Sequence, residues 1–320
     1  MFRKNVYHES SLLGRRESTL KKILTGLCLV MTMVLAGCGA KNEISEQEDA
    51  FEGTWIVEAD YAVSRLGNED TLFVDARGEK KAILGTVEGA VVTRWKDWCI
   101  TDGQEGDETW GCMKSPEEME NVLENLGISK EKEIILIGET LSGWGEDARL
   151  LWQLRAAGYE NVKMVNGGYD ALKASDIKMQ LSGSKPKKVE VEIEALDYSH
   201  TMTTEQLMEN YNQYKVVDVR TSEEYEGAIL YNEAQGGHLP GAIHVPYTEM
   251  FREDGTLKSN EELTEMFEKA GLAKEDAIVT YCTGGIRSAY AQLVLEMCGF
   301  ENSYNYDQSF WRWAVVGEVE

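Results

Sequence analysis

The chain has 320 residues, enough for about two domains with a substantial core. It carries 32 Lys and Arg against 56 Asp and Glu, which gives a formal net charge of -24. Because nucleic-acid binding needs a basic face, this charge argues against a nucleic-acid partner, and any anionic substrate has to be attracted by local positive groups.

The N-terminal residues 1–37 are predicted to be a lipoprotein signal peptide. The apolar run from Ile23 to Ala36 follows basic residues and is too short to span a bilayer comfortably. It ends in Leu35-Ala36-Gly37-Cys38, which resembles the bacterial lipobox, whose cysteine is lipidated and begins the mature protein. Residues 38–50 then form a tether, and we expect an extracytoplasmic protein anchored to the cell membrane through lipid on Cys38. The alternative is an ordinary secretory cleavage site.

Two cysteines flank an acidic segment, residues 101–111. In an oxidising compartment, Cys99 and Cys112 could form a disulfide that closes this loop. Sequence spacing cannot place two Cα atoms within bridging distance, so two free thiols remain the alternative. Cys298 falls on an apolar helical stripe and is predicted to be a core residue. The four histidines show no ligand spacing with the cysteines, so no metal site and no cofactor are expected.

The chain repeats itself. Four segments of the first half recur in the same order in the second half: residues 73–77 as 216–220, 85–91 as 237–243, 134–138 as 278–282, and 158–161 as 299–302. We therefore predict two copies of one α/β domain, residues 51–177 and 199–320, joined by a polar linker, residues 178–198. Apolar strands alternate with helical patterns such as Glu117 to Leu126 and Asn260 to Ala270, which indicates a parallel sheet flanked by helices in each copy.

The chemistry is expected at one strand end in the second copy. An apolar run from Ala277 to Tyr281 predicts a buried strand, followed by Cys282, two glycines and Arg287 at the start of a helix. Backbone N–H groups of such a loop converge on one point and favour an anionic sulfur there. Gly138 occupies the equivalent place in the first copy, and its loop is three residues longer. Cys282 is therefore the candidate nucleophile, and the first copy is predicted to lack the catalytic cysteine.

The second copy resembles a rhodanese domain. The resemblance rests on Asp218-Val219-Arg220, on residues 237–243, on Cys282 to Ser288 and on Tyr306-Asp307 before Trp311. The first copy resembles the catalytically silent domain of tandem thiosulfate and 3-mercaptopyruvate sulfurtransferases, including Asn166-Gly167-Gly168-Tyr169. Gln308 stands where this family usually has glycine, which puts the shape of that loop in question.

The resemblance implies sulfur transfer through a persulfide. Cys282 is expected to take sulfane sulfur from a small anionic donor, thiosulfate or 3-mercaptopyruvate, and to pass it to cyanide or a thiol. The implied substrate-binding residues are Thr283, Gly284, Gly285, Ile286, Arg287 and Arg220. Arg287 is expected to pair with the donor, whereas Arg220 either meets substrate or forms a structural salt bridge. The aromatic residues expected either to wall the cleft or to fill the core are Tyr304, Tyr306, Phe310, Trp311 and Trp313.

Two other functions fit part of this pattern. A cysteine-dependent phosphatase also combines a cysteine with an arginine, but its loop is one residue longer than the four residues from Thr283 to Ile286. A non-enzymatic surface protein that binds sulfur or a partner chain is the second alternative, because the sequence identifies no acceptor.

Overall fold

The structure, a computed structural model, describes residues 50–320. The predicted signal peptide, Cys38 and nearly all of the predicted tether lie outside the described residues. Within residues 50–320, no helix has the length and apolarity needed to cross a membrane.

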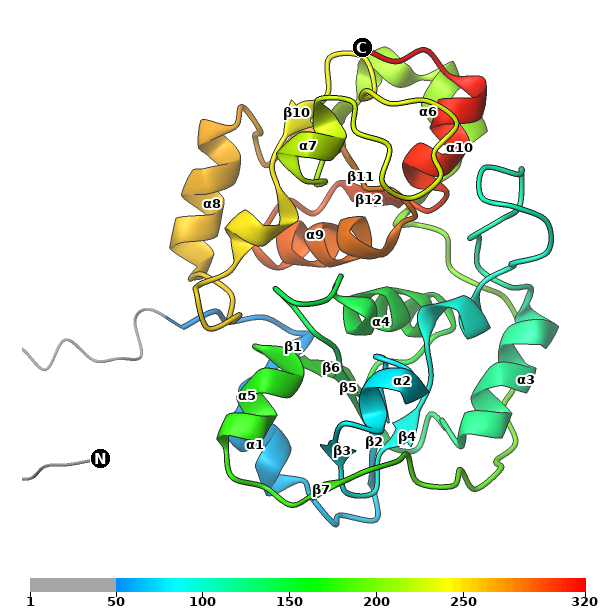
Figure 1. The fold of residues 1–320 in the computed structure, drawn as a ribbon, viewed down its shortest axis with the longest axis vertical. Coiled ribbons are helices and arrows are strands. Elements are labelled where there is room, and N and C mark those ends of the chain that lie inside the picture. The colour runs from blue at the N-terminus through cyan, green and yellow to red at the C-terminus, as the bar shows by residue number, and fades with distance from the viewer. Residues whose placement is uncertain (1–49) are drawn as a thin grey trace, which may run out of the picture. The chain divides into compact units, whose positions relative to one another are not determined.

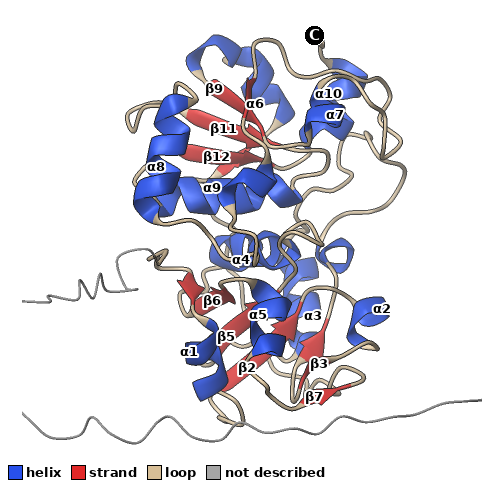
Figure 2. Ribbon diagram, turned by 60° about the vertical axis from the view of Figure 1, so that its left-hand side comes forward, coloured by secondary structure: helices blue, strands red, loops and turns tan. Residues whose placement is uncertain are grey.

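Each half of the described chain is built on a five-stranded parallel sheet (Figures 1 and 2). The first sheet has the order β1-β6-β5-β2-β4, with strands Ile56–Val57, Val162–Val165, Glu133–Ile137, Thr71–Asp75 and Val91–Val92. The second has the order β8-β12-β11-β9-β10, with strands Thr201–Met202, Ser303–Tyr306, Ile278–Tyr281, Lys215–Asp218 and Ile243–His244. Equivalent strands take equivalent places in the two sheets. The predicted fold of two tandem α/β domains is confirmed.

Helices cover both sheets. Those of the first domain are α1 (Ala59–Ser64), α2 (Glu79–Ala82), α3 (Pro116–Leu126), α4 (Glu146–Ala156) and α5 (Gly168–Ala174). Those of the second are α6 (Thr204–Glu209), α7 (Ser222–Tyr225), α8 (Asn260–Lys269), α9 (Ile286–Met297) and α10 (Ser309–Val316). The predicted helices 117–126 and 260–270 are α3 and α8, and each begins with a capping box, formed by Ser115 with Glu118 and by Ser259 with Glu262.

The loop before α10 differs from its counterpart in the first domain, as Gln308 suggested. Gly167 has a φ of 74°, whereas Gln308 has a φ of -74°. Glycine reaches the left-handed region without steric cost, and a residue with a Cβ avoids it. The Gln308 side chain accepts a hydrogen bond from Thr204 Oγ1 (2.7 Å) and donates one to the carbonyl oxygen of Glu108 in the first domain. The substitution therefore replaces a glycine turn with a contact between the domains.

The two domains meet where α4 packs against α9, at the centre of Figures 1 and 2. Both helices follow the central strands of their sheets, and one apolar core includes residues from each of them, such as Leu151 and Leu293. At one end of the contact, Arg155 forms two hydrogen bonds of 2.8 Å with Glu296. Paired guanidinium and carboxylate groups fix the relative position of the two helices.

Arg149 of α4 ties the first domain directly to the second. Its fully buried guanidinium donates to the carbonyl oxygens of Gly285 (2.9 Å) and Gly111 (2.8 Å), and it forms an ion pair with Asp307. Gly285 lies in the loop that contains Cys282, so a side chain of the first domain holds that loop through a hydrogen bond to its backbone. Asp307 also accepts a hydrogen bond from the backbone N–H of Met113 (3.1 Å), which completes the network.

The predicted linker and the acidic segment both pack against the domains. The predicted linker includes β7 (Met179–Gln180), which pairs with β3 (Thr86–Val87) of the first domain, and further along Ile193 is buried. The acidic segment 101–111 lies against α10, where Arg312 donates to the carbonyl oxygen of Gly106 (3.1 Å). Trp110 at its end meets Trp311 edge to face, with ring centroids 4.8 Å apart.

We predict that Arg149→Met destabilises the protein by about 3 kcal/mol, because it leaves the buried Asp307 carboxylate without its partner. Urea unfolding measures this change. Arg149→Met combined with Asp307→Asn should recover part of the loss, because no unpaired charge then remains. Equal stability of the single variant and the wild type would show that Arg149 does not join the domains.

Candidate active site

Cys282 lies where the sequence predicted, in the turn between β11 and α9, and its side chain is buried. Its backbone N–H donates to Ser309 Oγ (3.1 Å), and its carbonyl oxygen accepts from the N–H of Phe310 (3.0 Å). Gly285 takes a φ of 82°, which allows the chain to enter α9 directly after the loop. Residues 282–287, called here the cysteine loop, are thus fixed by the strand before them and the helix after them.

The surroundings of the sulfur favour the thiolate. Burial, the largest influence, opposes ionisation of Cys282, but the Arg287 charge and hydrogen bonds from Ser288 and the backbone of Gly284 outweigh it and lower the pKa. Ser288 Oγ lies 3.7 Å from Sγ and 2.7 Å from Asn305 Oδ1. Its single hydroxyl hydrogen can be donated to either atom, so Ser288 can turn toward the sulfur when the sulfur carries charge.

Arg287 has a buried partner that the sequence did not predict. Its guanidinium forms two hydrogen bonds with the Glu224 carboxylate, of 2.8 and 2.7 Å, and Thr283 Oγ1 donates to the same carboxylate (2.7 Å). Burial opposes the charge on Glu224, but these bonds outweigh it and lower its pKa to about 2. Glu224 is also the capping-box residue of α7, paired with Thr221. The pairing of Arg287 with a donor anion stays a prediction, because Glu224 already matches most of its charge.

A narrow pocket gives access to the sulfur. Its volume is about 30 Å³, and three aromatic side chains wall it: Trp144, Tyr231 and Trp311. The remaining lining residues belong to the cysteine loop and are Cys282, Thr283, Gly284, Ile286 and Arg287. A Cβ on Gly284 would overlap the Trp311 ring, so this glycine is needed for the ring to approach the loop. Cys282 therefore opens onto a small pocket whose outer part is aromatic.

The sequence identified this wall only in part. Trp311 was among the aromatic candidates, whereas Tyr306, Phe310 and Trp313 belong to the core. Trp144 was not predicted, because it comes from the longer loop of the first domain. The one signal in the sequence was a tryptophan between two glycines, Gly143 and Gly145, within this longer loop.

Arg220 does not line the pocket. It is buried, forms an ion pair with Asp218 (2.6 Å) and donates to the carbonyl oxygen of Gly237 (2.8 Å). Its guanidinium also lies over the Phe310 ring, 3.9 Å from the centroid. The structure thus shows the salt bridge considered for Arg220, and a contact of Arg220 with substrate stays a prediction. Arg77 makes the same set of contacts in the first domain, with Asp75, Gly85 and the Tyr169 ring.

Cys99 and Cys112 do not form a disulfide in the structure, and both are free thiols. The sulfur of Cys99 instead accepts weak contacts from Arg149 and Gln153, both at 3.6 Å, inside the domain interface. Burial raises the pKa of Cys112 to about 12 and also raises that of Cys99, where Arg149 opposes it. Burial therefore favours the neutral form of both thiols, whereas at Cys282 its influence is outweighed.

In the first domain, a carboxylate lies in the space that a side chain at the position of the cysteine would take. A Cβ on Gly138 would overlap the carboxylate of Asp147, and Asp147 stands in the first turn of α4 where Ser288 stands in α9. Burial, with help from the charge of Glu146, raises the pKa of Asp147 to about 7. The loop of the first domain that corresponds to the cysteine loop therefore has the titratable carboxylate of Asp147 beside it and no thiol.

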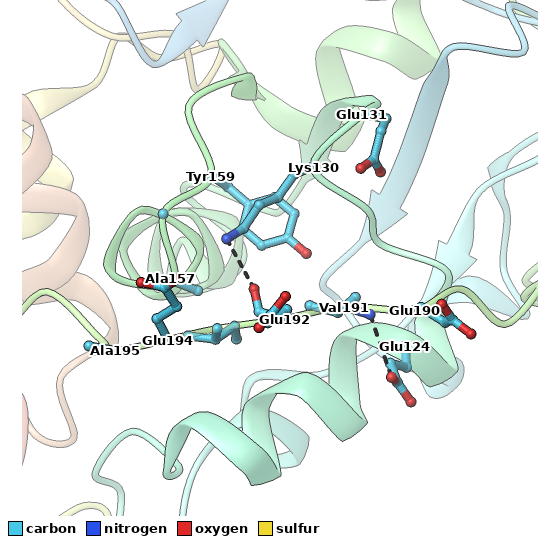
Figure 3. Close-up of a pocket in the computed structure, with 12 residues that line it drawn as sticks. Glu124, Lys130, Glu131, Ala157, Tyr159, Glu190, Val191, Glu192, Glu194 and Ala195 are labelled. Carbon is cyan, nitrogen blue, oxygen red and sulfur yellow. Dashed lines mark hydrogen bonds between the residues drawn. The ribbon is translucent and has the colours of Figure 1, made fainter.

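A much larger pocket lies elsewhere and carries no such chemistry. It has a volume of about 880 Å³ and is formed by the end of α3, the segment 190–195 and the turn at Tyr159 (Figure 3). Five glutamates line it, and Lys130 spans it to donate to the carbonyl oxygen of Glu192 (3.2 Å). It has neither a nucleophile nor an anion-binding loop. Across residues 50–320, the structure brings together no group of His, Cys, Asp and Glu side chains fit to hold a metal.

We predict that Arg287→Met raises the pKa of Cys282, because the remaining influences are burial, which opposes the thiolate, and hydrogen bonds alone. The pH dependence of alkylation, followed by mass spectrometry of the Cys282 peptide, measures this pKa. Arg287→Met combined with Glu224→Gln is the matched control for stability, since the single change leaves a buried carboxylate that costs about 3–5 kcal/mol. An unchanged pKa in both variants would contradict the assigned role of Arg287.

Asp147→Asn should change how stability depends on pH. The folded-state pKa of about 7 lies above the usual 3.8, so the folded protein binds this proton more tightly than the unfolded chain. The free energy of unfolding should therefore fall as the pH rises from 3.8 to about 7. Asp147→Asn should remove this part of the decline, as measured by urea unfolding across that range. The exposed Asp102→Asn is the control, and identical profiles for wild type and Asp147→Asn would disprove the assignment.

Comparison with known proteins agrees with this geometry. The family model described as "Rhodanese-like domain" matches residues 58–175 and 203–315. A protein of Mycolicibacterium smegmatis named "Putative thiosulfate sulfurtransferase" is 30% identical over 275 residues, covering 82% of this chain and 95% of the relative. "Sulfur carrier protein TtuD" of Thermus thermophilus is 30% identical, covering 63% of this chain and 75% of the relative.

A solved structure shares the fold. The anaerobic ergothioneine biosynthesis enzyme of Chlorobium limicola, in complex with trimethyl histidine, has a TM-score of 0.71 and 20% identity, covering 83% of this chain and 70% of that one. Two matched domains that fill most of the chain, together with relatives that span it, establish the family. The chain belongs to the rhodanese-like domain family, carries two copies of the domain and is a sulfurtransferase.

Proposed function

We propose that the protein moves sulfane sulfur from a small anionic donor, thiosulfate or 3-mercaptopyruvate, to a thiol or cyanide through a persulfide on Cys282. The lowered pKa of Cys282 is the observation that carries this proposal, because the thiolate is the nucleophile in such a transfer. Burial raises the pKa of Cys99, Cys112 and Cys298. Among the cysteines of residues 50–320, Cys282 alone therefore has a lowered pKa.

In the first step, the Cys282 thiolate attacks the outer sulfur of the donor. With thiosulfate, the sulfur–sulfur bond of the donor breaks, sulfite leaves with the electron pair, and a new sulfur–sulfur bond forms on Cys282. No external oxidant is needed, since the transferred sulfur is already at the sulfane level. Arg287 contributes a positive charge next to the sulfur, although Glu224 balances it.

The persulfide then occupies the pocket. Its outer sulfur carries the negative charge and lies among fixed N–H dipoles, which need no reorganisation as the charge moves. In the second step, an acceptor thiolate attacks the outer sulfur, leaves as a persulfide of its own, and returns the Cys282 thiolate. The phosphatase alternative is disfavoured by the loop length, since four residues separate Cys282 from Arg287, one fewer than in a cysteine-dependent phosphatase.

The relatives support the choice of donor and the idea of onward transfer. The name of the Mycolicibacterium smegmatis relative specifies thiosulfate, and the name of the Thermus thermophilus relative specifies a sulfur carrier. We therefore favour thiosulfate over 3-mercaptopyruvate as the donor. We also propose that lipid on Cys38 anchors the protein to the outer face of the bacterial cell membrane, on the strength of the sequence Leu35-Ala36-Gly37-Cys38.

Incubation of the reduced protein with thiosulfate should add one sulfur atom to Cys282, and mass spectrometry of the Cys282 peptide detects this adduct. Cys282→Ser should abolish both the adduct and transfer to cyanide, because no other thiol among residues 50–320 has a lowered pKa. Cys298→Ser is the matched control and should keep both. The proposal fails if the folded, reduced wild type gains no sulfur from thiosulfate or from 3-mercaptopyruvate.

A further inference from the structure

The first carbonyl groups of the cysteine loop are held by the start of α10. The carbonyl oxygen of Cys282 accepts a hydrogen bond from the N–H of Phe310 (3.0 Å). The carbonyl oxygen of Thr283 accepts one from the N–H of Trp311 (2.9 Å). Because a peptide bond is planar and trans, its C=O and its N–H point in opposite directions. A group that binds a carbonyl oxygen on one side of the loop therefore turns the following N–H toward the other side.

Gly284 shows what this orientation does for the sulfur. Its N–H belongs to the peptide whose carbonyl oxygen Trp311 holds, and this N–H forms a hydrogen bond with the sulfur of Cys282. The bond stabilises the thiolate and contributes to the lowered pKa of Cys282. The groups that bind the carbonyl oxygens of the loop therefore decide which N–H groups stabilise a negative sulfur.

The carbonyl oxygen of Gly285 is held from the first domain. Arg149 Nη1 donates to it (2.9 Å), and Asn305 Nδ2 adds a longer hydrogen bond (3.3 Å). The other terminal nitrogen of Arg149 binds the carbonyl oxygen of Gly111 (2.8 Å) and the Asp307 carboxylate, so the fully buried guanidinium is fixed in one position. A Cβ on Gly285 would overlap Arg149 Nη1, so the guanidinium packs directly on the loop.

The N–H on the opposite side of this peptide belongs to Ile286. Ile286 is the first residue of α9, so its N–H has no acceptor within the helix, and it lines the pocket next to Cys282. Because Arg149 binds the carbonyl oxygen of the same peptide in the buried interface, the N–H of Ile286 points away from Arg149 and toward the pocket. Glycine lets a peptide rotate easily. Without Arg149, the carbonyl oxygen of Gly285 can turn toward the negative sulfur and repel it.

We propose that Arg149 is a positioning residue for sulfur transfer, which holds the carbonyl oxygen of Gly285 and thereby keeps the N–H of Ile286 directed at the persulfide of Cys282. A dipole fixed in this way stabilises the negative outer sulfur. The inference rests on the proposed persulfide transfer. It gives the domain without a catalytic cysteine a part in the stabilisation of the intermediate, in addition to its part in joining the domains.

The first test measures the stability of the persulfide in Arg149→Lys. Lysine keeps a positive charge beside Asp307 but lacks the second nitrogen of the guanidinium fork, which binds Gly285. The Cys282 thiolate and thiosulfate are in equilibrium with the persulfide and sulfite, and mass spectrometry gives the persulfide fraction at a fixed ratio of thiosulfate to sulfite. The equilibrium constant for loading should fall about tenfold in Arg149→Lys, as expected for the loss of one hydrogen bond to a charged group.

Arg155→Lys is the matched control. Arg155 also joins α4 to α9, through its ion pair with Glu296, but it does not contact the cysteine loop. This variant should keep the loading equilibrium of the wild type, and urea unfolding shows that both variants are folded. A role of Arg149 in joining the domains alone predicts equal loading in the two variants. Equal loading in Arg149→Lys and Arg155→Lys would therefore overturn the proposal.

The second test does not depend on sulfur transfer. The pH dependence of alkylation by iodoacetamide gives the pKa of Cys282. Because lysine keeps the charge at position 149, a raised pKa in Arg149→Lys reports a changed orientation of the loop, and Arg155→Lys should leave the pKa unchanged. A raised pKa without any persulfide in the wild type would refute the proposed function and leave the positioning role standing. An unchanged pKa in Arg149→Lys would show that the loop keeps its orientation without the guanidinium, which would refute the positioning role.

Discussion

The packing of α4 against α9 is the contact on which the catalytic site depends. Both helices start from loops that follow central strands, so their contact brings the two loops of a duplicated chain to the same interface. Arg149 then crosses the interface to hold the carbonyl oxygen of Gly285, and Trp144 crosses it to wall the pocket. A buried guanidinium placed this way is costly unless every partner is present, which explains why Gly111 and Asp307 join the same network.

The two copies show how one backbone supports different roles. In each, an aspartate at a strand end pairs with an arginine two residues later, and that arginine lies over an aromatic ring: Tyr169 in the first domain and Phe310 in the second. The copies diverge at the loop itself. Cys282 faces Ser288, whereas Gly138 leaves room for the carboxylate of Asp147 at the position of that serine. The silent loop is therefore filled from within and cannot hold a transferable sulfur.

The positive charge of the catalytic site is paired with a carboxylate, which the anion-binding loop alone did not indicate. Arg287 lowers the pKa of Cys282, but its two hydrogen bonds with the Glu224 carboxylate reduce the positive charge that a molecule in the solvent meets. A buried ion pair avoids the cost of an isolated charge, and it keeps the guanidinium next to the sulfur in a single orientation. In a chain with a net charge of -24, the overall field repels a small anion, so only local groups of the site can attract one.

The sequence by itself determined the duplicated α/β fold, the strand that delivers Cys282 and the absence of a cysteine from the equivalent loop. These features are local: apolar runs, capping residues and a motif whose spacing recurs in both halves. The sequence also left two roles for Arg220, a contact with substrate and a structural salt bridge, and the structure shows the salt bridge. Only the tertiary structure decided that Arg287 pairs with Glu224, that Cys99 contacts Arg149 in place of Cys112, and that Trp144 reaches the catalytic pocket. Each of these depends on residues more than 40 positions apart in the chain, whose meeting is set by packing within the domains or between them and not by any pattern along either segment.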